Sequence, residues 1–142
     1  LRIFYLGGPG RTEVRSVASA DHGVSWGKPR VEFPLPGGGA GHYGVQVVEA
    51  ADGELHAAFH VHRGDRGKPG VDRHLDVWHA RTAGGKWGEP RRLFAGYVGS
   101  LRGFVQLKTG RLVLAFARAV PERLAPPPAG QPDRGWHDVV AY

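Results

Sequence analysis

The chain has 142 residues, a formal net charge of +6 and no cysteine. This length suffices for one folded domain, and the lack of cysteine excludes disulfides and thiolate zinc sites while leaving the compartment open, a secreted or periplasmic one included. No segment approaches the ~20 apolar residues of a membrane-spanning helix, and the cations are dispersed, so we expect neither membrane nor nucleic acid as partner. Short apolar runs between 23 glycines and 11 prolines predict an all-β fold.

The first element in chain order is a turn at residues 19–26, with the spacing S-x-D-x-G-x-[ST]-W. Its residues are Ser19, Asp21, Gly23, Ser25 and Trp26. A carboxylate two residues before a glycine can accept hydrogen bonds from its own turn, and glycine takes the positive φ that such turns require. We expect the tryptophan ring to insert between neighbouring layers. The segment resembles the Asp box, the hairpin signature of the sialidase superfamily, which lies on the outer hairpins of propeller blades and away from the reaction centre.

Two pairs of apolar runs further along the chain predict β-hairpins. One covers residues 45–59 about an Asp-Gly turn at Gly53, and the other covers residues 104–116 about Gly110. The box also has a degenerate copy, in which Trp87 stands 61 residues after Trp26 but Thr82 replaces the aspartate. Each repeat of roughly 60 residues therefore has two hairpins and four strands, as a propeller blade does.

This repeat predicts a β-propeller of antiparallel four-stranded blades. Residues 1–36 are then the end of one blade, 42–94 a full blade and 99–142 most of a third. Two and a half blades cannot close a ring, because a propeller protects its edges through radial repetition. We therefore expect the remaining blades in a longer chain, with six blades when complete, as in sialidases.

Two loops connect second to third strands in this arrangement. Residues 121–134 are proline-rich, and we interpret them as a surface connection. The polar loop at residues 62–72 is open to two interpretations, a surface connection or a substrate-facing loop. The resemblance places the acid/base aspartate of the family here, which makes Asp65 and Asp72 candidates, although loop acids are commonly only solvated. Arg63 matches the arginine that often ends the preceding strand in the family.

The resemblance implies a retaining glycoside hydrolase that removes terminal sialic acid or a related anionic sugar from a glycan or glycoconjugate, with no cofactor and no metal. Such enzymes use a tyrosine nucleophile, which the family pairs with a glutamate, and grip the substrate carboxylate with three arginines. Arg102 is the best candidate arginine, at the entrance of a first strand, but Gly103 and Phe104 replace the Ile-Pro of the family motif. The alternative for Arg102 is a surface arginine that braces the strand. Tyr43 and Tyr97 precede first strands, where packing is the commoner role.

Histidines form a further group. His56, His60 and His62 share parity on one strand, so we expect them on one face, with His74 on the next strand. Imidazoles could bind zinc or copper, but a reliable metal spacing is missing, which favours solvated or hydrogen-bonded histidines. Because fold does not imply function, two alternatives to the enzyme stay open: a non-catalytic propeller that binds carbohydrate or protein, and a purely structural repeat.

Overall fold

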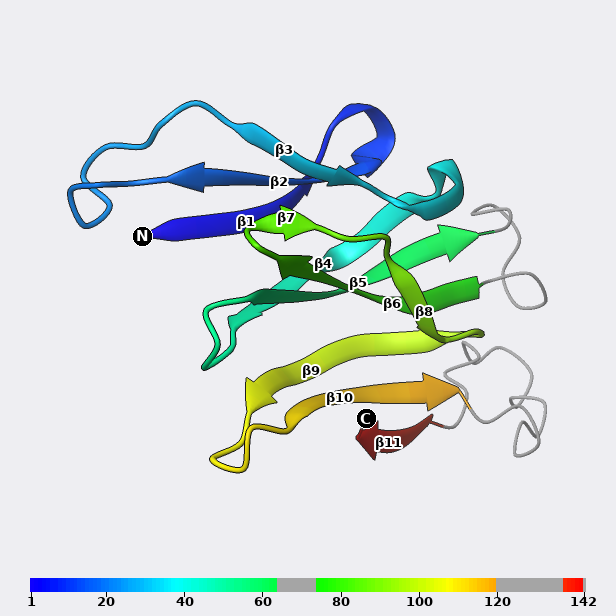
Figure 1. Cartoon of the computed structure of the whole chain (residues 1–142). Coiled ribbons are helices and arrows are strands. Elements are labelled where there is room, and N and C mark those ends of the chain that lie inside the picture. Colours follow the sequence, from blue (N-terminus) through cyan, green and yellow to red (C-terminus); the bar gives the residue numbers. More distant parts are fainter. Residues whose placement is uncertain (64–73, 120–136, 142) are drawn as a thin grey trace.

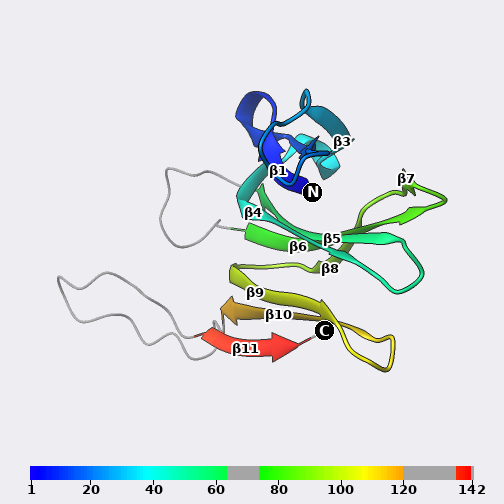
Figure 2. The same cartoon turned by 90° about the vertical axis from the view of Figure 1, so that its left-hand side faces the viewer.

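The computed structural model describes residues 1–63, 74–119 and 137–141, which form three antiparallel sheets and no α-helix. The predicted all-β class is confirmed, and none of the three sheets closes on itself. Figures 1 and 2 show the sheets stacked in chain order, with the second between the first and the third. In the described ranges no helix has the length and apolarity needed to cross a bilayer.

The first sheet has the order β1-β2-β3. Its strands are β1 (Arg2–Gly7), β2 (Glu13–Ala18) and β3 (Arg30–Pro34). A short 3₁₀ turn, η1 (Pro9–Arg11), connects β1 to β2, and a second, η2 (Pro36–Gly38), leads into the next sheet. The segment between β2 and β3 contains the Asp-box residues.

The second sheet is built from β4, β5 and β6 in sequence, with the short strand β7 and then β8 both paired to β6. The strands are β4 (Ala40–Glu49), β5 (Leu55–Arg63), β6 (His74–Ala83), β7 (Lys86–Trp87) and β8 (Arg91–Phe94). The hairpin predicted about Gly53 is confirmed: this glycine has a φ of 79° and its N–H donates to the Ala50 carbonyl at 2.8 Å.

The third sheet has the order β11-β10-β9. Its strands are β9 (Val98–Gln106), β10 (Leu112–Ala119) and β11 (His137–Ala141). The second predicted hairpin is also confirmed, because β9 and β10 pair across a turn in which Gly110 donates to the Leu107 carbonyl at 2.9 Å. Both turns thus use the same hydrogen bond from the turn glycine to the residue three positions earlier.

Strand β5 lies at the centre of the packing because both faces of its sheet are covered. Successive side chains of a strand point to opposite faces, so Ala57, Phe59 and Val61 join the core against the first sheet, whereas Ala58 joins the core against the third. The same geometry puts His56, His60 and His62 on the Ala58 face, as predicted. The residues of each core are listed here: Val14, Phe33, Leu35, Ala57, Phe59, Val61 and Ala80 for the first, and Ala58, Val77, Val98, Leu114 and Phe116 for the second.

The two ends of the stack differ (Figure 1). At one end, the turn end, lie the box and the hairpin turns at residues 50–54 and 107–111. At the other, the loop end, lie η1, η2, the C-terminal end of β5 and the connection from β8 to β9. Any loop that joins β5 to β6 therefore starts at the loop end, where Arg63 is the last residue of its strand.

Candidate functional site

The Asp-box residues form a self-contained hydrogen-bond network. Asp21 accepts from the backbone N–H of Ser25 at 2.9 Å and from the Ser19 hydroxyl at 2.7 Å, and its second oxygen accepts from the Ser25 hydroxyl. The Gly23 N–H donates to the Ser19 hydroxyl at 2.7 Å, and Gly23 has a φ of 96°. Hydrogen bonds from Ser25 and then Ser19 hold the pKa of Asp21 well below its usual range. The carboxylate thus organises its own turn.

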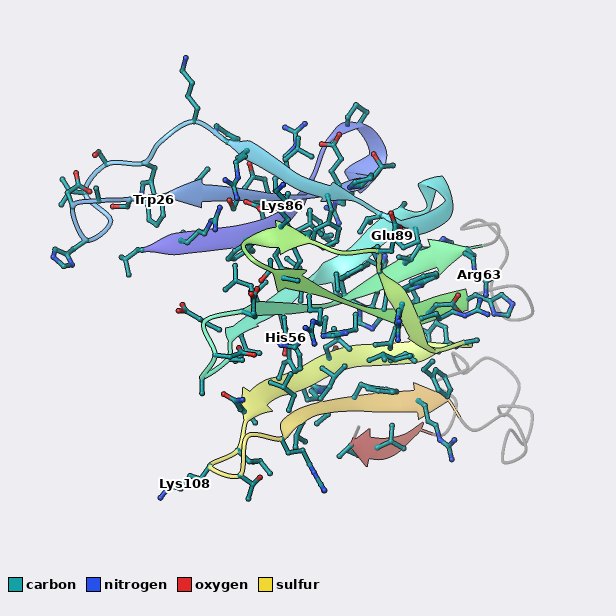
Figure 3. All side chains as sticks on the ribbon, in the orientation of Figure 1. Trp26, His56, Arg63, Lys86, Glu89 and Lys108 are labelled. Carbon is teal, nitrogen blue, oxygen red and sulfur yellow. The ribbon has the colours of Figure 1, made fainter. Side chains whose placement is uncertain are left out.

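The expected insertion of Trp26 between layers is wrong. Its side chain is 40% exposed, and its indole N–H donates to the Gly23 carbonyl of the same turn at 3.1 Å. The physical reason is the position of the turn, which projects beyond the strand ends so that the ring folds back on its own backbone (Figure 3). In the degenerate copy, by contrast, Trp87 packs between the first and second sheets, with its ring centroid 4.8 Å from that of Phe33.

At the loop end, a buried carboxylate joins two arginines. Asp76 on β6 is fully buried and accepts from the Nε of Arg63 at 2.7 Å and, more distantly, from Arg92 on β8 at 3.5 Å. Its other oxygen accepts from the Gly96 N–H at 3.0 Å. Burial alone would raise the pKa of Asp76, but the hydrogen bonds from Arg63 and Gly96 and the charges of the two arginines outweigh it and lower the pKa.

Sequence reasoning identified Arg63 but missed Asp76 and Arg92. A signal was present, because Asp76 stands between Leu75 and Val77 in a strand-like run. A carboxylate at such a position is buried, and a buried charge requires a partner. The identity of that partner depends on sheet pairing, since Arg63 and Asp76 meet only when β5 and β6 lie side by side.

The expected position of Arg102 at the entrance of its strand is wrong. Strand β9 begins four residues earlier, at Val98, and Arg102 lies at a β-bulge where the register with β10 shifts between Leu101 and Gly103. The extra residue of a bulge is unpaired in the ladder, and bulges redirect side chains. Arg102 is exposed.

Tyr43 was likewise expected to precede its strand, but it lies inside β4. It is part of a bulge between His42 and Val45, with a φ of 61°, and its side chain is 60% exposed. Its ring contacts those of His42 and His60, with centroids 4.2 and 5.6 Å apart respectively. Tyr97 directly precedes β9, as predicted.

The two acid/base candidates, Asp65 and Asp72, fall outside the residues that the structure describes, as does the loop at residues 121–134. Their catalytic role stays a prediction. What the structure adds is the position of Arg63 at the loop end, at the start of the connection that carries both aspartates.

His56, His60, His62 and His79 lie on the face of the second sheet that packs against the third, whereas His74 is exposed. His56 and His79 stack with a ring-nitrogen separation of 3.0 Å, and His79 also meets Phe104 edge-on. Burial lowers the pKa of both His60 and His79 to about 4. Within the described ranges, no three His, Asp or Glu side chains converge on a possible metal position. His60 and His79 are therefore neutral, packed imidazoles at pH 7.

A hollow of about 770 Å³ lies along β3, lined by residues 30–37 and 85–90. One of the lining residues is the acid Glu32, whose side chain is 1% exposed. Burial alone would raise the pKa of Glu32, but four donors outweigh this effect and lower it to about 2. These donors are Arg30, Ser16, Trp87 and Arg2. Glu32 therefore accepts hydrogen bonds from side chains of both the first and the second sheet.

Comparison of the sequence with models of known protein families and with curated proteins found no match. The resemblance to the sialidase superfamily thus depends on the residues of this chain. The candidate site is the loop end of the second sheet, with Arg63, Asp76 and Arg92. Arg102, the other candidate cation, is exposed inside β9 of the third sheet.

Proposed function

We propose that this chain is part of an Asp-box β-propeller that hydrolyses the glycosidic bond of a terminal sialic acid or related anionic sugar with retention. The observation that carries the proposal is the hydrogen-bond network of the box, in which Asp21 accepts from Ser19 and from the backbone and side chain of Ser25. Its residue spacing is the family signature, and the geometry provides the physical reason for each of its polar residues.

The propeller part of the proposal is supported by the arrangement of the sheets. Strands β4, β5, β6 and β8 form an antiparallel four-stranded meander with a neighbouring sheet on each side. Strand β4 is joined to β9 of the next sheet, since the Gln46 side chain donates to the Leu101 carbonyl at 3.0 Å. First strands of successive blades would lie beside each other in this way around a central axis, with the remaining blades of the ring supplied by a longer chain.

The chemistry is assigned to the loop end. A planar guanidinium matches a carboxylate through two parallel hydrogen bonds and keeps its charge at any working pH, which suits Arg63 and Arg102 to an anionic sugar. One of Asp65 and Asp72 would act as the acid/base that protonates the leaving oxygen and then activates water. Both belong to the connection that begins immediately after Arg63.

Two observations favour a second candidate, a non-catalytic propeller that binds carbohydrate or protein. Arg102 lies at a bulge inside its strand, with Gly103 and Phe104 in place of the family's Ile-Pro. The exposed Tyr43 contacts the imidazoles of His42 and His60 and not the glutamate that activates a tyrosine nucleophile in the family.

The proposal is tested on the full-length protein with a fluorogenic sialoside, following product stereochemistry by proton NMR. Retention of configuration is expected. Replacement of the true acid/base in Asp65→Asn or Asp72→Asn should lower kcat roughly 10²- to 10⁴-fold, while the other variant stays near the parent. Arg102→Ala should raise KM. Absence of turnover with sialosides, combined with glycan binding, would favour the non-catalytic candidate instead.

A further inference from the structure

The two arginines on Asp76 contact it less fully than Arg30 contacts the buried Glu32. Each contacts the carboxylate through a single nitrogen, Nε of Arg63 and Nη1 of Arg92. Around Glu32, by comparison, Arg30 donates through two nitrogens to the two carboxylate oxygens. The guanidinium groups at Asp76 therefore spend only part of their hydrogen-bonding capacity on it.

The Asp76 cluster is also accessible. The carboxylate is fully buried, whereas the Arg63 and Arg92 side chains are 48% and 45% exposed. Two guanidinium charges against one carboxylate leave a local excess of one positive charge. Arg92 is held a second time by the ring of Trp78, 6.0 Å from its guanidinium carbon. The result is a pair of cations that face solvent from fixed positions.

The backbone at this place is fixed by the same carboxylate. Asp76 accepts from the Gly96 N–H, and the Leu75 N–H donates to the Gly96 carbonyl at 2.8 Å. These bonds join the start of β6 to the connection between β8 and β9. Both lie at the loop end, where Arg63 is also found (Figure 3). Asp76 thus determines the positions of both arginines and of the connection beside them.

The geometry points to Asp76 as a positioning residue that holds Arg63 and Arg92 together as one binding site for a single oxyanion. A carboxylate or phosphate group suits paired guanidinium groups because both present oxygens in the geometry of the fork. The site rests on the proposed function in one respect, since we take the oxyanion to be an acidic group of the sugar ligand. Arg92, on β8, is then a specificity residue of the same site.

The test measures binding directly on the full-length protein. Arginine Nε–Hε NMR signals, assigned with Arg63→Lys and Arg92→Lys, are followed during titration with the methyl glycoside of N-acetylneuraminic acid. Its neutral methyl ester and inorganic phosphate are titrated in parallel. The acid should shift both signals and the ester should not. Asp76→Asn and Arg92→Gln should each weaken binding of the acid roughly tenfold.

Glu32→Gln is the matched control, because it removes the charge of another buried carboxylate that forms ion pairs with two arginines. It should lower thermal stability but leave affinity for the acid unchanged. Equal affinity in Asp76→Asn, Arg92→Gln and the parent would overturn the inference even if the sialoside is hydrolysed. Shifts of both signals in a protein without turnover would support it and reject only the hydrolase. A response to phosphate alone would keep the oxyanion site and overturn its assignment to a sugar.

Discussion

The box and its degenerate copy solve the same structural problem with carboxylates from different places. In the box, Asp21 lies inside the turn that it stabilises. In the copy, the aspartate position is Thr82, and the carboxylate comes from Glu54 in the neighbouring hairpin turn. Glu54 accepts from the Gly84 N–H at 2.8 Å and from the Thr82 hydroxyl. The Thr82 hydroxyl oxygen in turn accepts from the Leu55 N–H at 2.8 Å.

The tryptophan of the intact box makes fewer tertiary contacts than the tryptophan of the degenerate copy. Trp26 completes the intact motif but remains 40% exposed on its own turn. Trp87, in the degenerate copy, packs against Phe33 and Phe4 of the first sheet and donates to Glu32 at 2.9 Å. The intact signature therefore marks a local network, whereas the degenerate one has become part of the tertiary core. Loss of a motif residue is not loss of the structure that the motif stabilises.

The largest expected difference between the two turns comes from their tryptophans. Trp87→Ala removes the aromatic contact between two sheets and leaves a buried acceptor on Glu32 without one of its donors. We expect a loss of about 3 kcal/mol in the free energy of unfolding. Trp26→Ala removes a ring that is 40% exposed and hydrogen-bonded within its own turn, so the loss should be below about 1 kcal/mol. Chemical denaturation of the full-length protein measures both.

A Trp87→Phe variant separates packing from the hydrogen bond, because phenylalanine keeps a large ring but cannot donate to Glu32. It should retain more than half of the stability that Trp87→Ala loses. Equal losses for the two alanine variants would contradict the distinction between a local and a tertiary tryptophan.

The effect of pH should also separate the turns from the rest of the fold. Burial lowers the pKa of His60 to about 4, while an unfolded histidine titrates near 6.5. The unfolded chain therefore binds protons that the folded chain does not between these values, and stability is lost as the pH falls from about 6.5 to 4. For His60 the loss is on the order of 3 kcal/mol. His79, also lowered to about 4, changes stability in the same direction.

Both turn carboxylates have lowered pKa values, and the pKa of Asp21 is held so far below its usual range that this carboxylate stays ionised in this window. The amide chemical shift of Ser25, which donates to Asp21, should accordingly remain constant from pH 6.5 to 4 in the molecules that are still folded. Thermal denaturation across the same range measures the global loss, and His60→Leu should flatten its pH dependence. A stability that is independent of pH in the parent would contradict a neutral, buried His60.

Features encoded by neighbouring residues were predictable from the sequence. The all-β class and the turns at Gly53 and Gly110 depend on local turn chemistry, and both hairpins form where that chemistry places them. Arg63 at the end of its strand is also local information. The same local logic failed for Trp26, because the direction of a ring depends on whether another layer lies within its reach.

The rest depends on tertiary register. Glu54 and Gly84 are 30 residues apart in sequence, and Arg63 and Asp76 are 13 apart, so neither pair can be read before the strands are aligned. Arg102 was misplaced because β9 already begins at Val98, and the bulge at Arg102 interrupts the alternation by which the start of a strand is recognised in a sequence. Sequence reasoning therefore found residues of the candidate site but not the carboxylate that holds them.

A smaller effect distinguishes the two carboxylates. Asp21→Asn should disturb amides within the box alone, whereas Glu54→Gln should disturb two hairpins, because Glu54 contacts Gly84 directly and Leu55 through Thr82. Hydrogen exchange is the suitable measurement, and exchange of the Gly84 N–H should accelerate roughly tenfold in Glu54→Gln. If faster exchange in Glu54→Gln were confined to the Glu54 turn, the degenerate copy would not depend on the Glu54 carboxylate.

The smallest expected difference lies in the turn glycines. Gly84 has a φ of 57°, the centre of the left-handed region that asparagine also adopts, whereas Gly23 has a φ of 96°, well outside that centre. Gly84→Asn should therefore be nearly neutral, and Gly23→Asn should cost about 1 kcal/mol of unfolding free energy. Space is not the cause, since a Cβ on Gly23 would have its nearest neighbours at 3.6 Å and one on Gly84 would have none within 4 Å. Denaturant unfolding of the two variants compares them directly. A larger loss of unfolding free energy for Gly84→Asn would contradict this ranking. It would show that the two-residue turn of the degenerate copy tolerates a side chain less well than the wider box does.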